Sequence, residues 1–355
     1  MNHRERYLAA VKHEPTDRPP MDFIAEPRIV DKIAGYLAAA GPEDVPLGFD
    51  VDFRHIYQNA FRPPPIKDAY GAFTDIWGVR RRPVANEFGS YDEVDNRPFA
   101  GIRTMQEVAA YPWPSPDIFD FSTLQEQCRA YHGQYVVVFG DPGIMDVING
   151  TSYARDMEQV LIDIATEDPV GLALMDRYHQ FFLEVAQRAL AAAGGMIDVL
   201  WIGDDYGTQT GPLMGRKTWE RLFRPKLQSL IDLGHRYGAK VMLHSCGSNR
   251  TLIPSWIDMG LDIYQTVQVE AARMDPAELF REFGKHITFH GMIGLQSVLS
   301  HGTPQDVYRE VRRIVDLSGG SGYIVAPTHF FDLDVPVQNV CAVYEAGKEL
   351  KPKRP

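Results

Sequence analysis

Short apolar runs alternate with longer amphipathic stretches along most of this chain. The runs are rich in β-branched and aromatic residues, which favours buried strands. Eight of them stand out, at Pro20–Ala25, Gly48–Phe53, Tyr135–Phe139, Ile197–Ile202, Lys240–His244, Leu261–Val267, His286–His290 and Gly322–Ala326. The stretches between them repeat apolar residues with a helical period, most clearly at Ser152–Ala165, Asp168–Ala193, Gly215–Tyr237, Asp275–Phe283 and Pro304–Leu317. Strands that alternate with helices predict a parallel sheet.

Eight strand–helix units predict an α/β fold in which the sheet closes into a (β/α)8 TIM barrel. The rival is a doubly wound open sheet, which needs a glycine-rich phosphate loop after its first strand. The segment Ile24–Arg28 contains no glycine and is not such a loop. A chain of 355 residues is long for one domain, but α/β barrels often exceed the usual domain size. We therefore expect a single barrel domain over residues 1–355.

Residues 61–115 lack this alternation of strand and helix patterns. They are rich in proline, glycine and aromatic residues, as in Phe61–Pro65 and Asp75–Gly78. We expect an insertion with a small antiparallel hairpin at the mouth of the barrel. Long insertions in barrels usually form part of the substrate site or a lid, so Asp75 is a predicted substrate contact.

Composition narrows the class of protein. The formal net charge is -11, which argues against nucleic acid as a partner because phosphate binding needs a basic surface. Three cysteines give no disulfide framework and fit a reducing compartment. The N-terminus lacks a signal-peptide pattern, and no apolar run approaches the roughly 20 residues of a membrane span. These features predict a soluble, cytoplasmic protein that does not bind membranes.

Polar side chains recur where the predicted strands end. In a barrel of parallel strands these ends share one face, where catalytic groups gather. The set comprises Glu26, Arg54, His55, Asp141, Asp204, Asp205, Tyr206, His244, Cys246, Gln265, Gln268, His290 and His329. The residues expected to contact a substrate, together with Asp75, are Arg54, Asp141, Gln268 and His290.

His244 and Cys246 are the strongest metal-ligand candidates. They end a buried strand with one residue between them, and residues i and i+2 of a strand point to the same side. Zinc binds histidine nitrogen and cysteine sulfur, and a catalytic site keeps one position open. His329 is the predicted third ligand, with His290 as its substitute. The alternative is that His244 and Cys246 only pack and form hydrogen bonds at the barrel top.

The adjacent pair Asp204 and Asp205, and separately Glu26, suggest proton transfer. Adjacent carboxylates at Asp204 and Asp205 repel if both ionise, so one can acquire a raised pKa and donate a proton, or serve as an oxygen ligand or outer partner of the metal. Alternatively, one aspartate caps a following turn and the other is solvated. Glu26 is either a general acid or base, or a partner for Arg28 or Arg54. The predicted catalytic residues are Asp204, Asp205, Glu26 and Tyr206.

Across nearly its whole length the sequence resembles the uroporphyrinogen decarboxylase family. The resemblance rests on Arg4–Arg6 with Asp17–Pro20, Gly203–Gly207 with Pro212–Met214, Leu243–Gly247, Gly302–Pro304, and Ala326–His329 with Pro336–Val340. It implies a (β/α)8 barrel over the whole chain. It also implies one of two chemistries: cofactor-free decarboxylation of uroporphyrinogen in porphyrin biosynthesis, or methyl transfer from a methylated corrinoid, with zinc activating a thiol acceptor.

This chain departs from both branches. The decarboxylases have an arginine-rich segment after the first strand, whereas Phe23–Pro27 places Glu26 there, which would repel a polycarboxylate. The zinc methyltransferases resemble this chain at His244 and Cys246, but their third ligand is a cysteine, and His329 is the nearest candidate here. The chain therefore resembles the methyltransferase-like branch more closely.

The resemblance implies a corrinoid-linked methyltransferase that moves a methyl group between a methylated cobalamin protein and a thiol or pterin acceptor, assisted by zinc. Methylcobalamin would come from a partner protein, and the family's habit implies a homodimer. The alternative is a metal-independent decarboxylase of uroporphyrinogen or a smaller carboxylic acid. A third hypothesis is that the protein is a non-catalytic barrel that binds a corrinoid protein.

Overall fold

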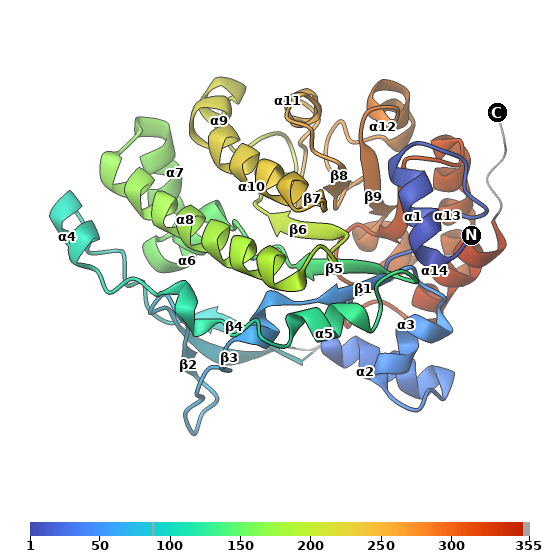
Figure 1. The fold of residues 1–355 in the computed structure, drawn as a ribbon, viewed down its shortest axis with the longest axis horizontal. Helices are drawn as coiled ribbons and strands as arrows, with labels where there is room; N and C mark the ends of the chain where they lie inside the picture. Colours follow the sequence, from blue (N-terminus) through green and yellow to red (C-terminus); the bar gives the residue numbers. More distant parts are fainter. Residues whose placement is uncertain (87–88, 351–355) are drawn as a thin grey trace.

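The computed structural model describes residues 1–86 and 89–350, which form an α/β fold around a curled, seven-stranded parallel sheet (Figure 1). The strand order is β1-β5-β6-β7-β8-β9-β10. The bounds are β1 Phe53–Ile56, β5 Val136–Gly140, β6 Val199–Gly203, β7 Lys240–His244, β8 Ile263–Gln265, β9 Thr288–Ile293 and β10 Tyr323–Pro327. The parallel sheet is confirmed, and its apolar strands fit a sheet that is covered on both faces.

The segment Pro20–Ala25 lies between the first and last strands of this sheet. Met21 forms a parallel bridge with Val325, and the Asp22 amide donates to the Val325 carbonyl. On the other side, the Asp52 amide donates to the Met21 carbonyl. The predicted strand here is therefore present only as isolated bridges, since Pro19 and Pro20 have no N–H to donate. This position is consistent with an eighth strand, and the closed barrel stays a prediction.

The predicted strand Gly48–Phe53 is wrong in its position. A short helix, α3 (Val45–Gly48), occupies its start, and Asp50 has a φ of 57°, which interrupts an extended chain. The strand begins only at Phe53. Of the other six predicted strands, the one at Lys240–His244 coincides with β7, and the remaining five overlap observed strands with shifted ends.

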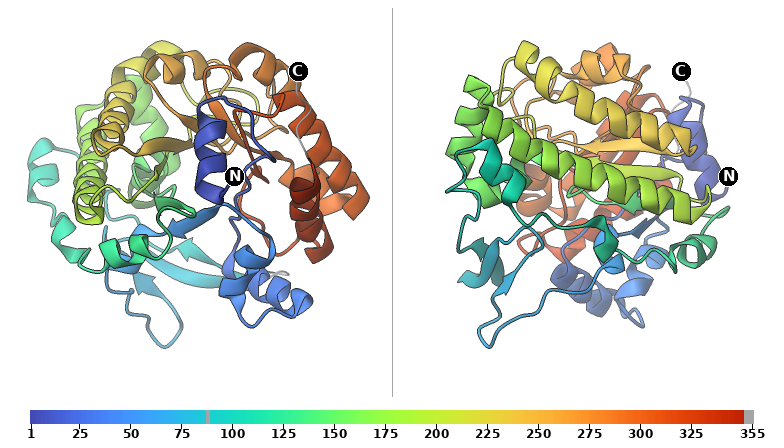
Figure 2. Two further views of the ribbon diagram at one scale, coloured as in Figure 1. Left: turned by 45° about the vertical axis from the view of Figure 1, so that its right-hand side comes forward. Right: turned by 60° about the vertical axis from the view of Figure 1, so that its left-hand side comes forward.

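Helices lie around the outside of the sheet, and α1 lies in front of its centre (Figure 2, left). Their bounds are α1 His3–Val11, α2 Pro27–Leu37, α4 Met105–Ala110, α5 Leu124–Arg129, α6 Val147–Arg155, α7 Met157–Thr166, α8 Pro169–Ala193, α9 Arg216–Leu222, α10 Arg224–Arg236, α11 Ile253–Asp258, α12 Pro276–Phe283, α13 Pro304–Ser318 and α14 Val337–Glu349. Short 3-10 turns at Pro42–Asp44, Gln58–Phe61 and Pro116–Ile118 and a π-helical turn at Leu295–Leu299 connect them. In the described part of the chain, no helix is long and apolar enough to cross a bilayer.

Two predicted helices are each divided in two. The stretch Ser152–Ala165 is interrupted at Asp156, whose φ of 106° is left-handed and whose side chain caps the next helix by accepting from the Glu158 amide. The stretch Gly215–Tyr237 is interrupted at Phe223, before Pro225 in the first turn of α10. Proline favours the start of a helix and disfavours a continuous helix through the preceding residues.

The insertion contains the predicted antiparallel hairpin and one further strand. Strands β2 (Phe73–Thr74), β3 (Arg80–Asn86) and β4 (Gly89–Val94) form a three-stranded sheet at one side of the molecule (Figure 1). Trp77 stacks on Tyr178 of α8, with their ring centroids 3.8 Å apart. This aromatic contact attaches the insertion to the main body.

Alternate residues of the large sheet form a separate hydrophobic cluster. It contains Phe53, Val136, Val138, Val199, Trp201, Met242, Ile263 and Ile324, with Tyr7 of α1. His244 follows Met242 by two residues, so the period of a strand places its side chain on the same face, beyond the apolar cluster.

Candidate functional site

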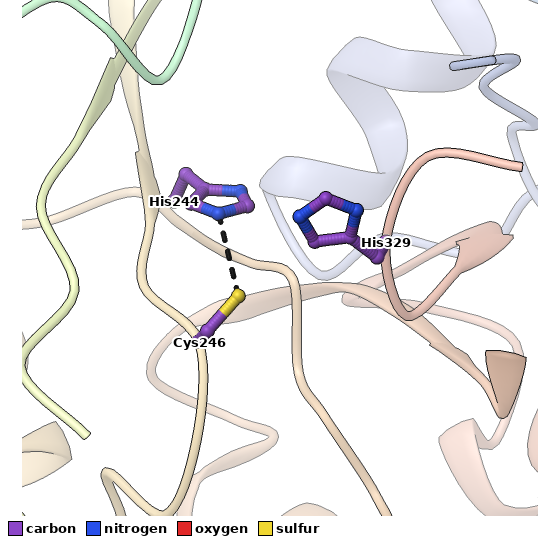
Figure 3. A group of neighbouring side chains, drawn as sticks. All are labelled: His244, Cys246 and His329. Atoms are coloured by element: carbon purple, nitrogen blue, oxygen red, sulfur yellow. Dashed lines mark hydrogen bonds between the residues drawn. The ribbon is translucent and has the colours of Figure 1, made fainter. Parts of the chain in front are cut away.

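His244, Cys246 and His329 meet at the strand ends (Figure 3). One nitrogen or sulfur atom from each lies within 4.8 Å of the others. The His244 Nε2 atom is 3.5 Å from the Cys246 Sγ atom, and the two imidazole centroids are 5.6 Å apart. The structure therefore brings together the three predicted metal ligands from two strands that are distant in sequence.

The chain after β7 is shaped to present Cys246. The Cys246 amide donates to the Asp205 Oδ1 atom at 2.7 Å, which fixes the turn against the loop after β6. The next residue, Gly247, has a φ of 84°, and a Cβ atom there would lie 2.6 Å from the Gly207 backbone. A residue with a side chain would push these two loops apart, so glycine is required at this position.

Gln265 fixes the proton on His244. Its Oε1 atom accepts from the Trp201 indole, which can only donate, so the atom at this position is oxygen. The same oxygen lies 2.7 Å from the His244 Nδ1 atom, which must therefore carry the proton. The lone pair of the Nε2 atom then faces Cys246 and His329. A partner that fixes the tautomer in this way is characteristic of histidine metal ligands.

His329 lies at the rim of the pocket. Although the residue is exposed, its ring lies among enough protein atoms that desolvation, together with the nearby His244, lowers its pKa to about 4. The imidazole is therefore neutral near pH 7. A neutral imidazole can donate a lone pair to a metal ion.

Two of the three candidate ligands, His244 and His329, border a cavity of about 430 Å³. Its lining comprises Tyr57, Asp141, Pro142, Gly143, Asp146, Asn149, Tyr153, Asp204, Asp205, His244, His329 and Phe330. Four aspartates thus share one cavity with two of the candidate ligands. Nitrogen and sulfur donors at one side suit zinc, and the acidic wall favours positive charge.

Asp204 and Asp205 have different partners. The Asp204 Oδ1 atom accepts from the Ile148 amide in the first turn of α6, so Asp204 caps a helix that precedes it in the chain and not a turn that follows it. Burial and the neighbouring Asp146 raise the pKa of Asp204 well above its usual value. Asp205 accepts from Cys246 and from the Asn149 side chain, and its Oδ1 atom is 3.8 Å from the His244 Nε2 atom.

Asp146 is a member of this site that the sequence pattern did not single out. Desolvation of its half-buried carboxyl group, together with Asp205, raises its pKa to about 8. Burial also raises the pKa of Asp141 to about 6. The signal that could have identified Asp146 is its place in the same loop as Asp141, directly after a buried strand. For Gln265, the sequence predicts a place at a strand end but no particular role.

Three predicted site residues lie elsewhere. Glu26 caps α2 and pairs with Arg28 at 2.8 Å, which agrees with the ion-pair alternative, and it lines a different cavity. Arg54 lies 3.8 Å from the centre of the Tyr135 ring and lines a third cavity. Tyr206 is fully buried among Trp219, Phe223 and Trp256 in the core. The positions of these three residues give no support to the roles predicted for them.

His290 is not placed to substitute for His329. Its Nε2 atom donates to the Asp22 Oδ2 atom at 2.9 Å, and His55 holds the other oxygen at 2.8 Å. Although burial raises the pKa of Asp22, these two histidines lower it below its usual range. Gln268 is likewise structural, since its Oε1 atom accepts from the Gly247 amide at 3.0 Å.

Asp75 lies in an adjoining cavity of about 290 Å³, which shares Asp141, Asp146 and Tyr153 with the metal-ligand cavity. Asp75 accepts from the Trp77 and Val79 amides, and its Oδ2 atom is 3.4 Å from Arg81. The insertion therefore contributes to the wall of the extended pocket.

Comparisons with known proteins agree with this fold. The uroporphyrinogen decarboxylase (URO-D) family model matches residues 145–350, more than half of the chain. The solved structure of a methyltransferase from Methanosarcina mazei aligns over 98% of this chain and 99% of its own, with a TM-score of 0.69 and 15% identity. The structure of bee venom hyaluronidase in complex with a hyaluronic acid tetramer aligns over 86% of this chain and 90% of its own, at 11% identity. Its TM-score of 0.34 is too low to indicate the same fold. No curated protein gives a significant match.

Proposed function

Because the chain belongs to the uroporphyrinogen decarboxylase family, we propose that it is a methyltransferase of the corrinoid-linked branch, with zinc held by His244, Cys246 and His329. The observation that carries the proposal is the convergence of one donor atom from each of these three residues within 4.8 Å. The similarity to a structure described as a methyltransferase supports the branch. The proposal takes the curled sheet as a closed (β/α)8 barrel, with residues 20–25 in the place of the eighth strand.

The small-molecule substrate in this proposal is a thiol acceptor, and a corrinoid protein supplies the methyl group. When bound, zinc would lower the pKa of a coordinated thiol and so favour the nucleophilic thiolate. The chain itself orients the ligands: Gln265 sets the tautomer of His244, and Asp205 holds the backbone of Cys246. Burial and Asp205 raise the pKa of the Cys246 thiol, so metal binding must displace a proton from this residue.

The charge of the cavity counts against decarboxylation of uroporphyrinogen. Among the described residues that line it, four are aspartates and none is lysine or arginine. A polycarboxylate would gain no charge-assisted pairing there and would be repelled by the aspartates that remain ionised.

The proposal is tested by the zinc content of the purified, untagged protein. We expect about one zinc per chain, as in catalytic sites with three protein ligands. The zinc-loaded protein should also transfer a methyl group from free methylcobalamin to a thiol. The change in corrinoid absorbance measures this transfer. A protein that takes up no zinc after incubation with the metal and releases carbon dioxide from uroporphyrinogen would contradict the proposal.

Gln265→Leu is expected to weaken zinc binding by about 10- to 100-fold, the usual effect of losing a partner that orients a ligand. The variant removes the acceptor for His244 Nδ1, so the ring loses its fixed tautomer. The measurement is competition with a chromophoric chelator. Gln265→Glu, which keeps an acceptor oxygen, should retain most of the affinity. Equal affinities for Gln265→Leu and the unchanged protein would disprove the orienting role.

A further inference from the structure

The cavity beside the candidate ligands is unusually acidic. Asp141, Asp146, Asp204 and Asp205 all line it. Two cations, Arg62 and Arg81, line the adjoining cavity. Arg62 donates to the Asn59 side chain at 2.8 Å, whereas Arg81 is 3.4 Å from Asp75 and stacks over the Tyr153 ring at 4.5 Å. Arg81 is therefore already paired, and the four aspartates face a space without a cationic side chain among the described lining residues.

One of these carboxylates has an unused acceptor. Asp204 is 2% exposed, and its Oδ2 atom has no hydrogen-bond partner among the described residues, although its Oδ1 atom caps α6. A buried acceptor without a partner is unfavourable, and more so when the group is charged. A donor that carries positive charge would remove this cost.

The carboxylates also oppose one another's ionisation. Desolvation and Asp205 raise the pKa of Asp146, and desolvation together with Asp146 raises that of Asp204. A cation between them would favour the ionised forms and release protons. The geometric observation that indicates a positively charged group is the buried, unpartnered Oδ2 atom of Asp204 in a cavity lined by four aspartates.

The other walls suit an organic cation. Tyr57, Tyr153 and Phe330 line the same cavity, and aromatic faces and edges can surround an alkylammonium group. The acidic wall also begins next to the metal ligands, since Asp205 is 3.8 Å from the His244 Nε2 atom. A molecule that reaches both features needs only a short spacer between its two functional groups.

We propose that the thiol acceptor carries a protonated amine, which the aspartates around Asp146 bind while its sulfur lies beside His244, Cys246 and His329. The proposal rests on the thiol-binding function argued above and adds the chemical class of the acceptor. A short aminothiol should bind, whereas thiols with a sulfonate or carboxylate in place of the amine should be repelled.

The test is calorimetric binding of three thiols of similar size to the zinc-loaded protein near pH 7: cysteamine, 2-mercaptoethanol and 2-mercaptoethanesulfonate. Cysteamine is expected to bind about 10- to 100-fold more tightly than 2-mercaptoethanol, the range for a buried hydrogen bond to a charged group. The sulfonate should bind most weakly. Equal affinities, or the reverse order, would overturn the proposal.

The variant Asp146→Asn tests the proposed ammonium site without changing any of the three metal ligands. The side chain of Asp146 does not cap α6, so the substitution removes the carboxyl group that would pair with the ammonium without removing a helix cap. It should abolish most of the preference for cysteamine and leave 2-mercaptoethanol binding nearly unchanged. Asp92→Asn, on exposed β4 outside this cavity, removes the same charge and should keep the preference. A preference that survives in Asp146→Asn would contradict the assignment.

Ethylamine binding to the metal-free protein distinguishes failure of this inference from failure of the proposed function. If ethylamine binds and Asp146→Asn weakens it, the ammonium site is supported even where zinc loading fails. If zinc binds and the three thiols do not differ, the inference fails and the proposed function stands. Displacement of ethylamine by low concentrations of Mg²⁺ or Ca²⁺ would assign the carboxylates to a divalent cation and overturn the proposal.

Discussion

Replacing Cys246 with serine is expected to reduce zinc affinity by more than about 100-fold, beyond the effect of losing an orienting partner. Serine keeps the approximate size of the side chain but removes the thiolate, the softest of the three donors and the only one that is negatively charged. His244→Ala should have a similar effect, because its Nε2 atom is the donor nearest to the sulfur. Zinc content after dialysis against a chelator measures both losses.

The matched control for the thiol is Cys341→Ala. Cys341 is a buried cysteine on α14, outside the metal-ligand cavity, and it should be replaceable without loss of zinc. Methyl transfer should fall together with zinc content in Cys246→Ser and His244→Ala and remain in the control. A Cys246→Ser protein that keeps its zinc and full activity would rule out this ligand set.

The metal ligands were predictable because the period of a strand acts over two residues. Although β7 ends at His244, Cys246 stays on the same side because Asp205 holds its amide in the turn beyond the strand. Strand β10 brings His329 to the same edge. The choice between His329 and His290 was not predictable. His290 is level with Gln265 in the sheet, but Asp22, from the opposite end of the chain, holds its Nε2 atom. No local pattern shows a contact between residues so far apart in sequence.

Two of the misplaced residues have local explanations. Phe53 belongs to the inner cluster and His55 bonds Asp22, so the alternation of a strand turns Arg54 to the opposite face. This exclusion was available from the sequence once β1 was placed correctly. Tyr206 follows Asp204 by two residues, but β6 ends at Gly203, so the period of a strand no longer applies there.

Gln265 and Asp146 are site residues that the sequence pattern did not identify. A glutamine at a strand end is chemically unremarkable until its oxygen is found between Trp201 and His244. Asp146 becomes informative only when Asp141 of its own loop and two aspartates from the loop after β6 meet it in one cavity. The fold class thus follows from local periodicity, whereas the charge of the site depends on contacts between distant segments.

Asp52→Ala is expected to lower the free energy of unfolding by about 3–5 kcal/mol, the cost of removing one partner of a buried ion pair. The Asp52 side chain is fully buried and accepts from Arg6, from Arg18 and from the Met21 amide. Its loss leaves two guanidinium groups, each only 8% exposed, without their shared counter-charge. Urea denaturation followed by circular dichroism measures the change.

Asp17→Ala is the matched control, because Asp17 also pairs with Arg6 but its side chain is 45% exposed. Its loss should cost no more than about 1 kcal/mol, as for other solvent-exposed pairs. The difference between the two variants tests whether Asp52 connects α1 and β1 to the segment Pro20–Ala25. That segment carries Asp22, which holds His55 and His290. If Asp52→Ala is no less stable than Asp17→Ala, the segment must be held by its backbone bridges and not by this buried carboxylate.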